Sequence, residues 1–234
     1  MNKNDLIEDI LQPLRGPVLH AHRQSRKLLE RDDLTDEVRQ GLLMIRSMCA
    51  RAENVFSGAH LLQDINSLNL KIHLSRCSVG QLFTLVDDAA DDMTALLDPE
   101  RQLKLNVHEE QFHPWASLRL SLDSGLFNTA VRNILENAAR YSFRGTAVDV
   151  LASYTPPLFT VIVRNRGLRM TAQELQSIAD SGYRGHAGML ATGEDSGIGL
   201  WLVSRIMQLH QGTLSFHPAP EGATEVHMAF PCGE

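Results

Sequence analysis

The chain has 234 residues, of which 43% are hydrophobic and 21% are charged. This composition supplies enough apolar side chains for a buried core and excludes an intrinsically disordered protein. The formal net charge of -6, from 22 basic and 28 acidic residues, argues against a nucleic-acid binder, because such proteins carry a basic face. No apolar run reaches the roughly 18 residues of a membrane-spanning helix, so no membrane span is expected.

Residues 1 to about 70 have the apolar spacing of two long helices. In the second of them, apolar side chains recur in alternating steps of four and three residues, from Val38 through Leu42 and Ile45 to Ala59. This heptad pattern is typical of a helix in a coiled coil or a bundle. Thr35 precedes the pattern and is expected to cap this helix.

Two helices cannot bury such a long apolar seam by themselves. The simplest structure that does so is a four-helix bundle made by two copies of the chain. We therefore expect a homodimer through residues 1–70. The pattern places a helical hairpin at residues 1–72 and a second domain at residues 73–234.

The second domain mixes strand and helix patterns. Strands are expected at residues 103–108 and 117–122, where apolar and polar residues alternate. Residues 148–154 and 159–163 are expected to form two strands joined by Pro156-Pro157, and residues 213–216 and 225–230 to form the closing strands. Helices are expected at residues 123–141, 171–178 and 199–210. This mixture predicts an α+β fold in which helices pack on a sheet as a two-layer α/β sandwich.

The three cysteines, Cys49, Cys77 and Cys232, are far apart in the sequence. Their odd number and wide spacing fit neither a disulfide framework nor a zinc site. We expect free thiols in a reducing, cytoplasmic environment.

Residues 133–142 form the first segment with chemistry suited to a metal–phosphate ligand. Asn133, Asn137 and Arg140 are spaced i, i+4 and i+7, so they share one face of the predicted helix. A side-chain amide oxygen is a suitable ligand for Mg²⁺. An ordinary solvated helix face would show the same pattern.

Two glycine-containing segments follow. Residues 159–167 form a predicted strand that ends at Asn165 and Gly167, and residues 193–200 place Gly197 and Gly199 at the start of a helix. Glycines at a helix N-terminus let backbone amides approach phosphate oxygens, and the helix dipole favours the negative charge.

Taken in this order, the segments resemble the N box and the two glycine boxes of sensor histidine kinases. Residues 208–213, Gln-Leu-His-Gln-Gly-Thr, are similar to that family's entry into a strand, and the resemblance continues through the hairpin. It implies a Bergerat-type (GHKL) ATP-binding domain behind a dimerisation and phosphoacceptor hairpin, in two-component signal transduction. It also implies ATP and Mg²⁺ as ligands and a response-regulator receiver domain as partner.

The resemblance also assigns roles by position. Asn137 corresponds to the Mg²⁺ ligand, with Asn133 and Arg140 close to the phosphates. Asn165 takes the adenine-reading position, and Gly167 leaves room for the base. The remaining expected nucleotide contacts are Tyr141, Gly197, Gly199 and Leu200. The alternative is that Tyr141 is a plain core residue and Arg140 a surface charge.

The phosphoacceptor motif is altered. The family pattern His-Glu-Leu-Arg-x-Pro-Leu is matched by Gln-Pro-Leu-Arg-Gly-Pro-Val, with Gln12 at the acceptor position and Pro13 in place of the acidic residue. Gly16 stands where many members carry the residue used in dephosphorylation. A glutamine amide lacks the nucleophilic nitrogen lone pair of neutral imidazole. His20, further along the helix, is expected to be a surface histidine rather than a substitute acceptor.

The nucleotide site departs from the family as well. Asn165 replaces an Asp, Arg169 replaces the second glycine of the first box, and Asp195 replaces the first glycine of the second box. Because an amide can either accept or donate a hydrogen bond, three outcomes stay open at Asn165. Adenine is kept, adenine is bound more weakly, or a 6-oxopurine is tolerated.

Three functions are therefore weighed. The first is a kinase-like dimer, a pseudokinase, that binds ATP with Mg²⁺ and regulates or docks a response regulator, with autophosphorylation impaired by Gln12. The second is an active histidine kinase whose acceptor was replaced artificially or that uses another acceptor. The third is a phosphotransfer-like adaptor dimer without nucleotide. Changes at Pro13 and Gly16 favour the first over a single artificial replacement, and whether the chain is an enzyme stays open.

Overall fold

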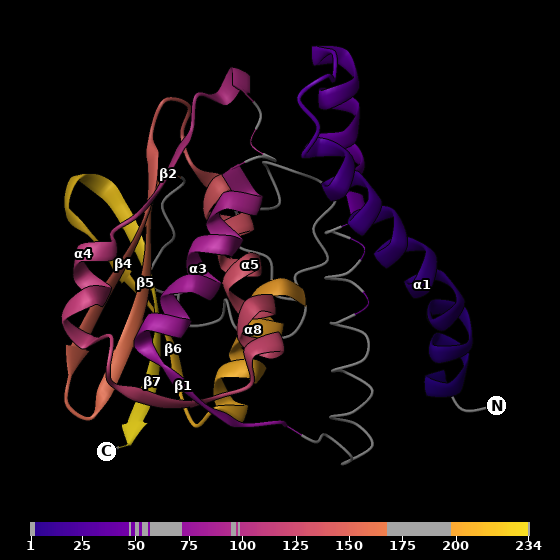
Figure 1. Ribbon diagram of the computed structural model, residues 1–234. Coiled ribbons are helices and arrows are strands. Elements are labelled where there is room, and N and C mark those ends of the chain that lie inside the picture. The colour runs from indigo at the N-terminus through magenta and orange to yellow at the C-terminus, as the bar shows by residue number, and fades with distance from the viewer. Residues whose placement is uncertain are drawn as a thin grey trace. The chain divides into compact units, whose positions relative to one another are not determined.

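The computed structural model describes residues 3–46, 48–49, 52, 56, 72–94, 97, 99–167 and 198–233. The chain divides into two compact units, Met1–Lys71 and Ile72–Glu234, and Figure 1 shows the elements of each. Within the described ranges, none of the helices combines the length and the apolar character that crossing a membrane requires.

The first unit is helical wherever it is described, apart from one turn. Helix α1 spans Lys3–Leu29, and residues 36–46 form the next helix. Thr35 Oγ1 accepts a hydrogen bond from the N–H of Val38 (3.4 Å), which confirms the predicted N-cap. The described parts of the predicted hairpin are therefore present.

A single arginine fixes the turn between these two helices. The guanidinium of Arg39 donates to the carbonyl oxygens of Leu29 (3.3 Å) and Arg31 (3.1 Å). Leu29 is the last residue of α1, so its carbonyl oxygen has no further helical N–H to accept from, and Arg31 lies in the turn that follows. A side chain of the second helix thus supplies a hydrogen bond that the last carbonyl oxygen of α1 lacks within its own helix.

One sheet forms the base of the second unit. Its strands in the described part of the chain are β1 (Ser75–Ser78), β2 (Lys104–Val107), β3 (Arg119–Leu122), β4 (Ala147–Thr155), β5 (Leu158–Arg166), β6 (Thr213–Pro218) and β7 (Ala223–Gly233). The order is β1-β3-β7-β5-β4-β2, and β6 also pairs with β7. Only β2 and β4 run parallel; the other pairs are antiparallel.

Three helices cover one face of this sheet (Figure 1). They are α3 (Val79–Thr94), α5 (Ser124–Tyr141) and α8 (Ile198–Leu209), with α5 in contact with both of the others. The short helix α4 (Glu109–Phe112) follows β2. Alternate side chains of three strands fill the layer between sheet and helices: Val148, Val150, Phe159, Val161, Val163, Val226, Met228 and Phe230. The predicted two-layer α+β fold is confirmed.

All six predicted strands are present, and two predicted helices are found as α5 and α8. The third, at residues 171–178, lies outside the described residues. The sequence analysis did not predict β1 or α3. A signal for α3 exists, because its buried residues Val79, Leu82, Val86 and Ala89 recur in steps of three and four.

His210 ties the start of α5 to the end of α8. Its Nδ1 donates to the carbonyl oxygen of Ile206 (2.7 Å), and its Nε2 accepts from the N–H of Asp123 (2.9 Å). Because a carbonyl only accepts and an amide N–H only donates, the buried imidazole is the neutral tautomer protonated at Nδ1. Asp123 in turn caps α5 by accepting from the N–H groups of Gly125 and Leu126.

Gly212 permits the tight step from α8 into β6. A Cβ at this position would lie 2.5 Å from the carbonyl oxygen of Ala229 and 2.8 Å from Cε of Met207. No larger residue fits without moving β7. The sequence segment 208–213 is therefore a connector that fixes α8 against the sheet.

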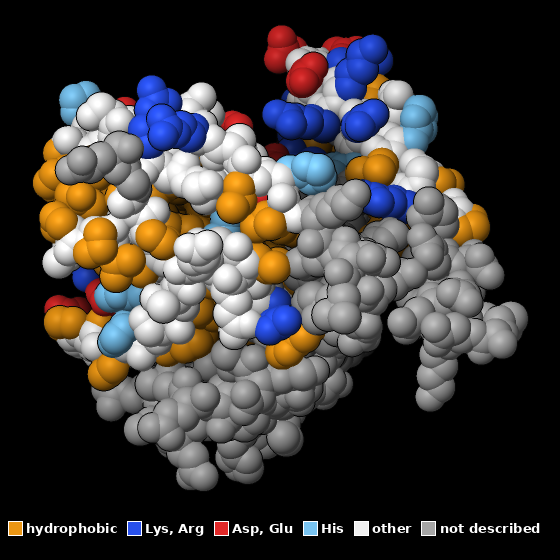
Figure 2. Space-filling model, turned by 90° about the horizontal axis from the view of Figure 1, so that it is seen from below, with side chains coloured by type: hydrophobic (Ala, Val, Ile, Leu, Met, Phe, Trp, Pro, Cys, Tyr) orange, Lys and Arg blue, Asp and Glu red, His pale blue; other side chains and the backbone are white. Residues whose placement is uncertain are grey.

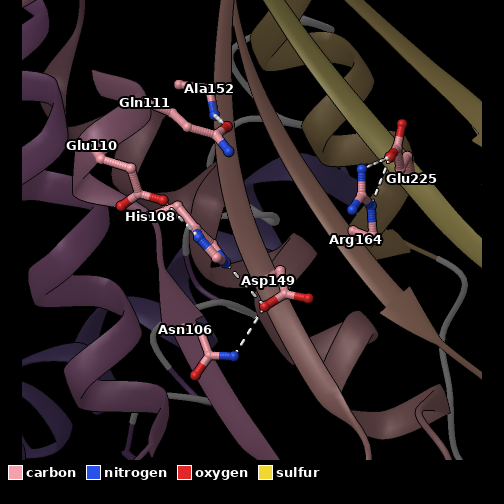
Figure 3. A network of polar contacts seen from close by, with 8 residues as sticks. All are labelled: Asn106, His108, Glu110, Gln111, Asp149, Ala152, Arg164 and Glu225. Atoms are coloured by element: carbon pink, nitrogen blue, oxygen red, sulfur yellow. Dashed lines mark hydrogen bonds and ion pairs between the residues drawn. The ribbon is translucent and has the colours of Figure 1, made fainter. Parts of the chain in front are cut away.

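A row of polar side chains crosses the other face of the sheet (Figure 3). Asn106, Asp149, Arg164 and Glu225 are cross-strand neighbours on β2, β4, β5 and β7. Asn106 donates to Asp149 (2.9 Å), and Arg164 Nε donates to Glu225 (2.7 Å). Burial alone would raise the pKa of Glu225, but hydrogen bonds from His227 and Arg164 hold it below its usual value.

His108 extends this row at the edge of the sheet. Its Nε2 lies 3.2 Å from Asp149 Oδ1, and its Nδ1 lies 3.0 Å from Glu110 Oε1. The hydrogen bond with Asp149 raises the pKa of His108 most; partial burial opposes it, and Glu110 adds a further increase. The charged imidazolium is thus favoured in the folded chain.

We expect Asp149→Asn to destabilise the protein more in acid than in base. A histidine whose pKa is raised by folding contributes stability fully below its unfolded pKa of about 6.5, and loses it as the pH rises through the folded value. The pH-dependent part should be a few tenths of a kcal/mol, because solvent screens this pair. Urea unfolding at about pH 5.5 and about pH 8.5 measures it.

The control is Asn106→Ala, which removes the other side-chain hydrogen bond to Asp149. The amide of Asn106 does not titrate. Its effect on the free energy of unfolding should be the same at both pH values. If the loss of unfolding free energy in Asp149→Asn did not shrink with rising pH, the raised pKa of His108 would be contradicted.

Candidate functional site

Helix α5 separates an apolar face from a polar one. Its residues Phe127, Val131, Ile134 and Ala138 are buried in the core, at steps of four, three and four residues, as predicted. The predicted site residues lie on another face of the same helix. The helix therefore holds them in fixed positions against the sheet.

The structure brings two of the predicted asparagines next to the start of α8. Asn133 is 8% exposed, and its Nδ2 donates to the carbonyl oxygen of Thr129 (2.8 Å). A Cβ on Gly199 would lie 2.9 Å from Asn133 Oδ1 and 4.0 Å from Asn137 Nδ2. Gly199 is the second residue of α8, so the backbone of that helix approaches both amides closely only because a side chain is missing there.

This arrangement fits a phosphate chain with a divalent cation. The first N–H groups of a helix have no acceptor within the helix, and the dipole makes that end positive. Asparagine amides supply neutral oxygens beside it. Among the described residues, no group of three or more His, Cys, Asp or Glu could hold a metal ion, but Mg²⁺ is commonly held by one or two protein oxygens together with phosphates.

Two other predicted residues near the phosphate position have a defined place. Leu200 lies in the first turn of α8 and is half-buried. Arg140 donates from Nη2 to Glu136 Oε1 (2.9 Å), an ion pair within one turn of α5. Gly197, like Arg169 and Asp195, lies outside the described residues.

The other end of α5 meets the end of β5. Ser142 and Gly167 form an isolated antiparallel bridge, and the N–H of Phe143 donates to the carbonyl oxygen of Arg166 (2.9 Å). A Cβ on Gly167 would lie 2.0 Å from the carbonyl oxygen of Tyr141. The position therefore requires glycine, for backbone packing as well as for any ligand.

Asn165 lies at the same corner and is half-buried. Its Nδ2 donates to Ser142 Oγ (3.3 Å). The predicted base-reading residues Asn165, Gly167 and Tyr141 are thus brought together at the C-terminal end of α5. Asn137 and Asn133 lie about one and two turns earlier along the same helix.

Arg101 is a residue of this corner that the sequence analysis missed. From the turn Pro99–Arg101, its guanidinium donates to the carbonyl oxygens of Ala139 (2.8 Å), Arg140 (3.2 Å) and Ser142 (2.5 Å). A cation at this position also complements the negative end of the helix dipole. No local sequence pattern indicates a contact between residues about 40 positions apart.

The altered phosphoacceptor motif lies in the first unit. Gln12 belongs to α1, and Pro13 and Gly16 in the next turn are exposed, as is His20. A Cβ on Gly16 would meet nothing within 4 Å. The surface around the acceptor position is therefore open within α1.

Comparison with known protein families places the second unit. Residues 123–234 match the family described as histidine kinase-, DNA gyrase B-, and HSP90-like ATPase. Over these residues the chain is similar to that ATPase family. The match begins at the cap of α5 and runs through β7, so it contains both ends of the candidate site.

The homology extends over the hairpin. Sensor protein QseC of Escherichia coli (strain K12) is 29% identical over 224 residues, which cover 95% of this chain and 46% of that protein. Sensor protein kinase PmrB of Pseudomonas aeruginosa is 26% identical over 227 residues, covering 97% and 45%. The chain is homologous to sensor histidine kinases and spans about half the length of these curated relatives.

Solved structures share the fold. The Acinetobacter baumannii histidine kinase AdeS has a TM-score of 0.57 at 14% identity, over 95% of this chain and 98% of that one. The full-length ShkA complex with AMPPNP has a TM-score of 0.62 at 16% identity, over 99% and 46%. The mycobacterial sensor histidine kinase MprB gives 0.55 at 19%, over 68% and 98%. The predicted GHKL fold is thus confirmed.

We expect Gly167→Ala to lower the free energy of unfolding by about 2–4 kcal/mol, because its Cβ would force the end of β5 away from α5. Gly125→Ala is the matched control. Its Cβ would lie 3.5 Å from the nearest atom, in the first turn of α5, so stability should stay equal or rise slightly. Urea unfolding compares the two, and equal stability of both variants would contradict the close approach at Tyr141.

Proposed function

We propose that the chain is a histidine-kinase-like signalling protein of the two-component type. It binds ATP with Mg²⁺ and regulates or docks a response regulator, while its own autophosphorylation is impaired at Gln12. The observation that carries the proposal is the meeting of Asn133 and Asn137 with Gly199 at the start of α8, inside a domain of the ATPase family.

Different residues of the site contact the metal, the phosphates and the base of the nucleotide. Asn137 holds Mg²⁺ through its side-chain oxygen, and Asn133 lies beside the phosphates. Arg140 leaves its present ion-pair partner, Glu136, and binds a phosphate instead. Mg²⁺, when bound, neutralises charge on the phosphate oxygens. The start of α8, with Gly199 and Leu200, accepts the phosphate chain, and the base lies near Tyr141, Asn165 and Gly167. Gly197, which lies outside the described residues, is expected to contact the phosphates as well.

The acceptor helix lacks the chemistry for autophosphorylation. The nitrogen of the Gln12 amide shares its lone pair with the carbonyl and cannot attack phosphorus as neutral imidazole does. Pro13 has no side chain able to assist removal of a proton. The γ-phosphoryl group therefore stays on the nucleotide, and the exposed surface around Gln12 and Arg15 serves as the docking face for a receiver domain.

We further propose that residues 1–70 form a homodimer through a four-helix bundle. Large apolar side chains of the described first unit are exposed: Leu14, Leu28, Val38, Met44, Ile45 and Met48. Val38 and Ile45 belong to the heptad seam. A second copy covers such a stripe most simply, because apolar surface of this extent on a helical hairpin favours association.

We also place the chain in the cytoplasm. Cys49, Cys77 and Cys232 are free thiols, as reducing compartments maintain them. Burial raises the pKa of the Cys77 and Cys232 thiols. They therefore stay protonated and unreactive.

An active ATP-dependent protein histidine kinase is the second candidate function. The alignment with relatives such as PmrB, whose name is sensor protein kinase, runs through the hairpin as well as the ATPase domain. In this case another acceptor replaces Gln12, and the exposed His20 is the nearest described histidine on α1.

We expect Gln12→His to acquire phosphate that the natural chain does not. Both proteins, with Gln12→Ala and Gln12→His/Asn137→Ala as controls, are incubated with γ-labelled ATP and Mg²⁺. Acid-labile label should appear on Gln12→His alone, because only that variant has both a nucleophile and an intact metal ligand. Label on the natural chain would establish the active kinase, and label on none would favour the adaptor without nucleotide.

A further inference from the structure

We propose that Ser142 fixes the orientation of the Asn165 amide so that its oxygen faces the base, which makes the site selective for 6-aminopurine nucleotides over 6-oxopurine nucleotides. The inference rests on the proposed function, in which Asn165 reads the base. It assigns Ser142 as a positioning residue and resolves the ambiguity of an amide at a position where an acceptor is needed.

The proton of the Ser142 hydroxyl has only one destination. Ser142 Oγ lies 2.6 Å from the carbonyl oxygen of Ala138. A carbonyl oxygen cannot donate, so the hydroxyl proton must lie between these two atoms. The serine oxygen is then left with lone pairs alone and can only accept from its second neighbour.

That second neighbour is the side-chain amide of Asn165. The amide atom 3.3 Å from Ser142 Oγ must be the nitrogen, because an oxygen there would meet lone pairs without a proton. The nitrogen is also the end that packs against Gly167, whose added Cβ would lie 3.1 Å from it. The hydrogen-bond chain from Asn165 through Ser142 to Ala138 thus runs in one direction.

The acceptor end of Asn165 is consequently the one left for a ligand. No other group among the described residues donates to its Oδ1. A 6-amino group donates to this oxygen, as it would to the carboxylate of the family motif. A 6-oxo group would place two acceptors against each other. Sites built around one hydrogen bond discriminate strongly against a partner that cannot make it.

Ser142 itself has little freedom to turn. It is 4% exposed, its N–H donates to the carbonyl oxygen of Ala138 (3.1 Å), and its own carbonyl oxygen accepts from Arg101 (2.5 Å). The bridge to Gly167 holds it from the other side. The orientation of Asn165 is thus imposed by a rigid backbone corner, whether or not a nucleotide is bound.

The test compares Mg-ATP with Mg-ITP, whose base carries an oxygen in place of the 6-amino group. Calorimetric titration of the full chain gives both dissociation constants. The natural protein should prefer ATP by about tenfold or more. Ser142→Ala should lower that preference to about threefold or less, because the amide can then present either end. Ser142→Thr, which keeps the hydroxyl, should retain the preference.

A second variant separates orientation from general damage to the site. The double variant Ser142→Ala/Asn165→Asp presents oxygen at both ends of the side chain with no serine oxygen beside it, and needs no positioning. It should therefore regain the ATP preference that Ser142→Ala loses. Circular dichroism and thermal unfolding confirm that each variant is folded. A loss of affinity for both nucleotides with an unchanged ratio would overturn the positioning role.

The remaining outcomes distinguish this inference from the proposed function. A natural chain that binds neither nucleotide would overturn both. Equal binding of ATP and ITP by the natural chain would leave nucleotide binding standing and overturn the inference. So would a Ser142→Ala variant that keeps the full preference, since the amide would then be oriented without the serine.

Discussion

The placement of helix α5 is the constraint on which the second unit depends, because the helix is held at both ends by hydrogen bonds that are at least partly buried. At its start, the neutral imidazole of His210 accepts from Asp123 and donates to the last turn of α8. At its end, Arg101 binds the carbonyl oxygens that the helix leaves without partners. Together with the buried apolar face of the helix, these contacts fix its rotation over the sheet.

The fixed rotation of α5 determines where the residues of the candidate site lie. One face of α5 fills the core, so the face with Asn133 and Asn137 is directed at the first turn of α8. The site then relies on two close backbone approaches, at Gly199 and Gly167, where an added Cβ would lie 2.9 Å from an amide oxygen and 2.0 Å from a carbonyl oxygen. The second approach is backbone against backbone and leaves no room for adjustment. The altered acceptor motif lies in the other unit and leaves both approaches intact.

Much of this could be predicted from the sequence because the signals are local. Alternation revealed β2 and β3, helical spacing revealed α5, and Thr35 and the heptad pattern revealed the start of the second helix of the hairpin. Motif spacing selected the asparagines and glycines of the site. Helix α3 was missed although its buried positions repeat at helical spacing.

The rest depends on contacts between residues far apart in the sequence. Nothing near Arg101 indicates that it closes the end of α5, and nothing near His210 indicates its bond to Asp123. The identity of Asn165 as acceptor or donor is set by the hydroxyl of Ser142, 23 positions away. A sequence shows which atoms Asn165 has; only the fold shows which of them is already engaged.

The central claim is that the nucleotide site stays intact in a chain whose acceptor position holds glutamine. Calorimetric titration of the natural chain with AMPPNP, with and without Mg²⁺, tests it most directly. The account predicts saturable binding that requires Mg²⁺, is lost in Asn137→Ala and is kept in Asn128→Ala, a change of the same kind earlier on α5. Absence of binding by the natural chain, or equal binding by both variants, would contradict it.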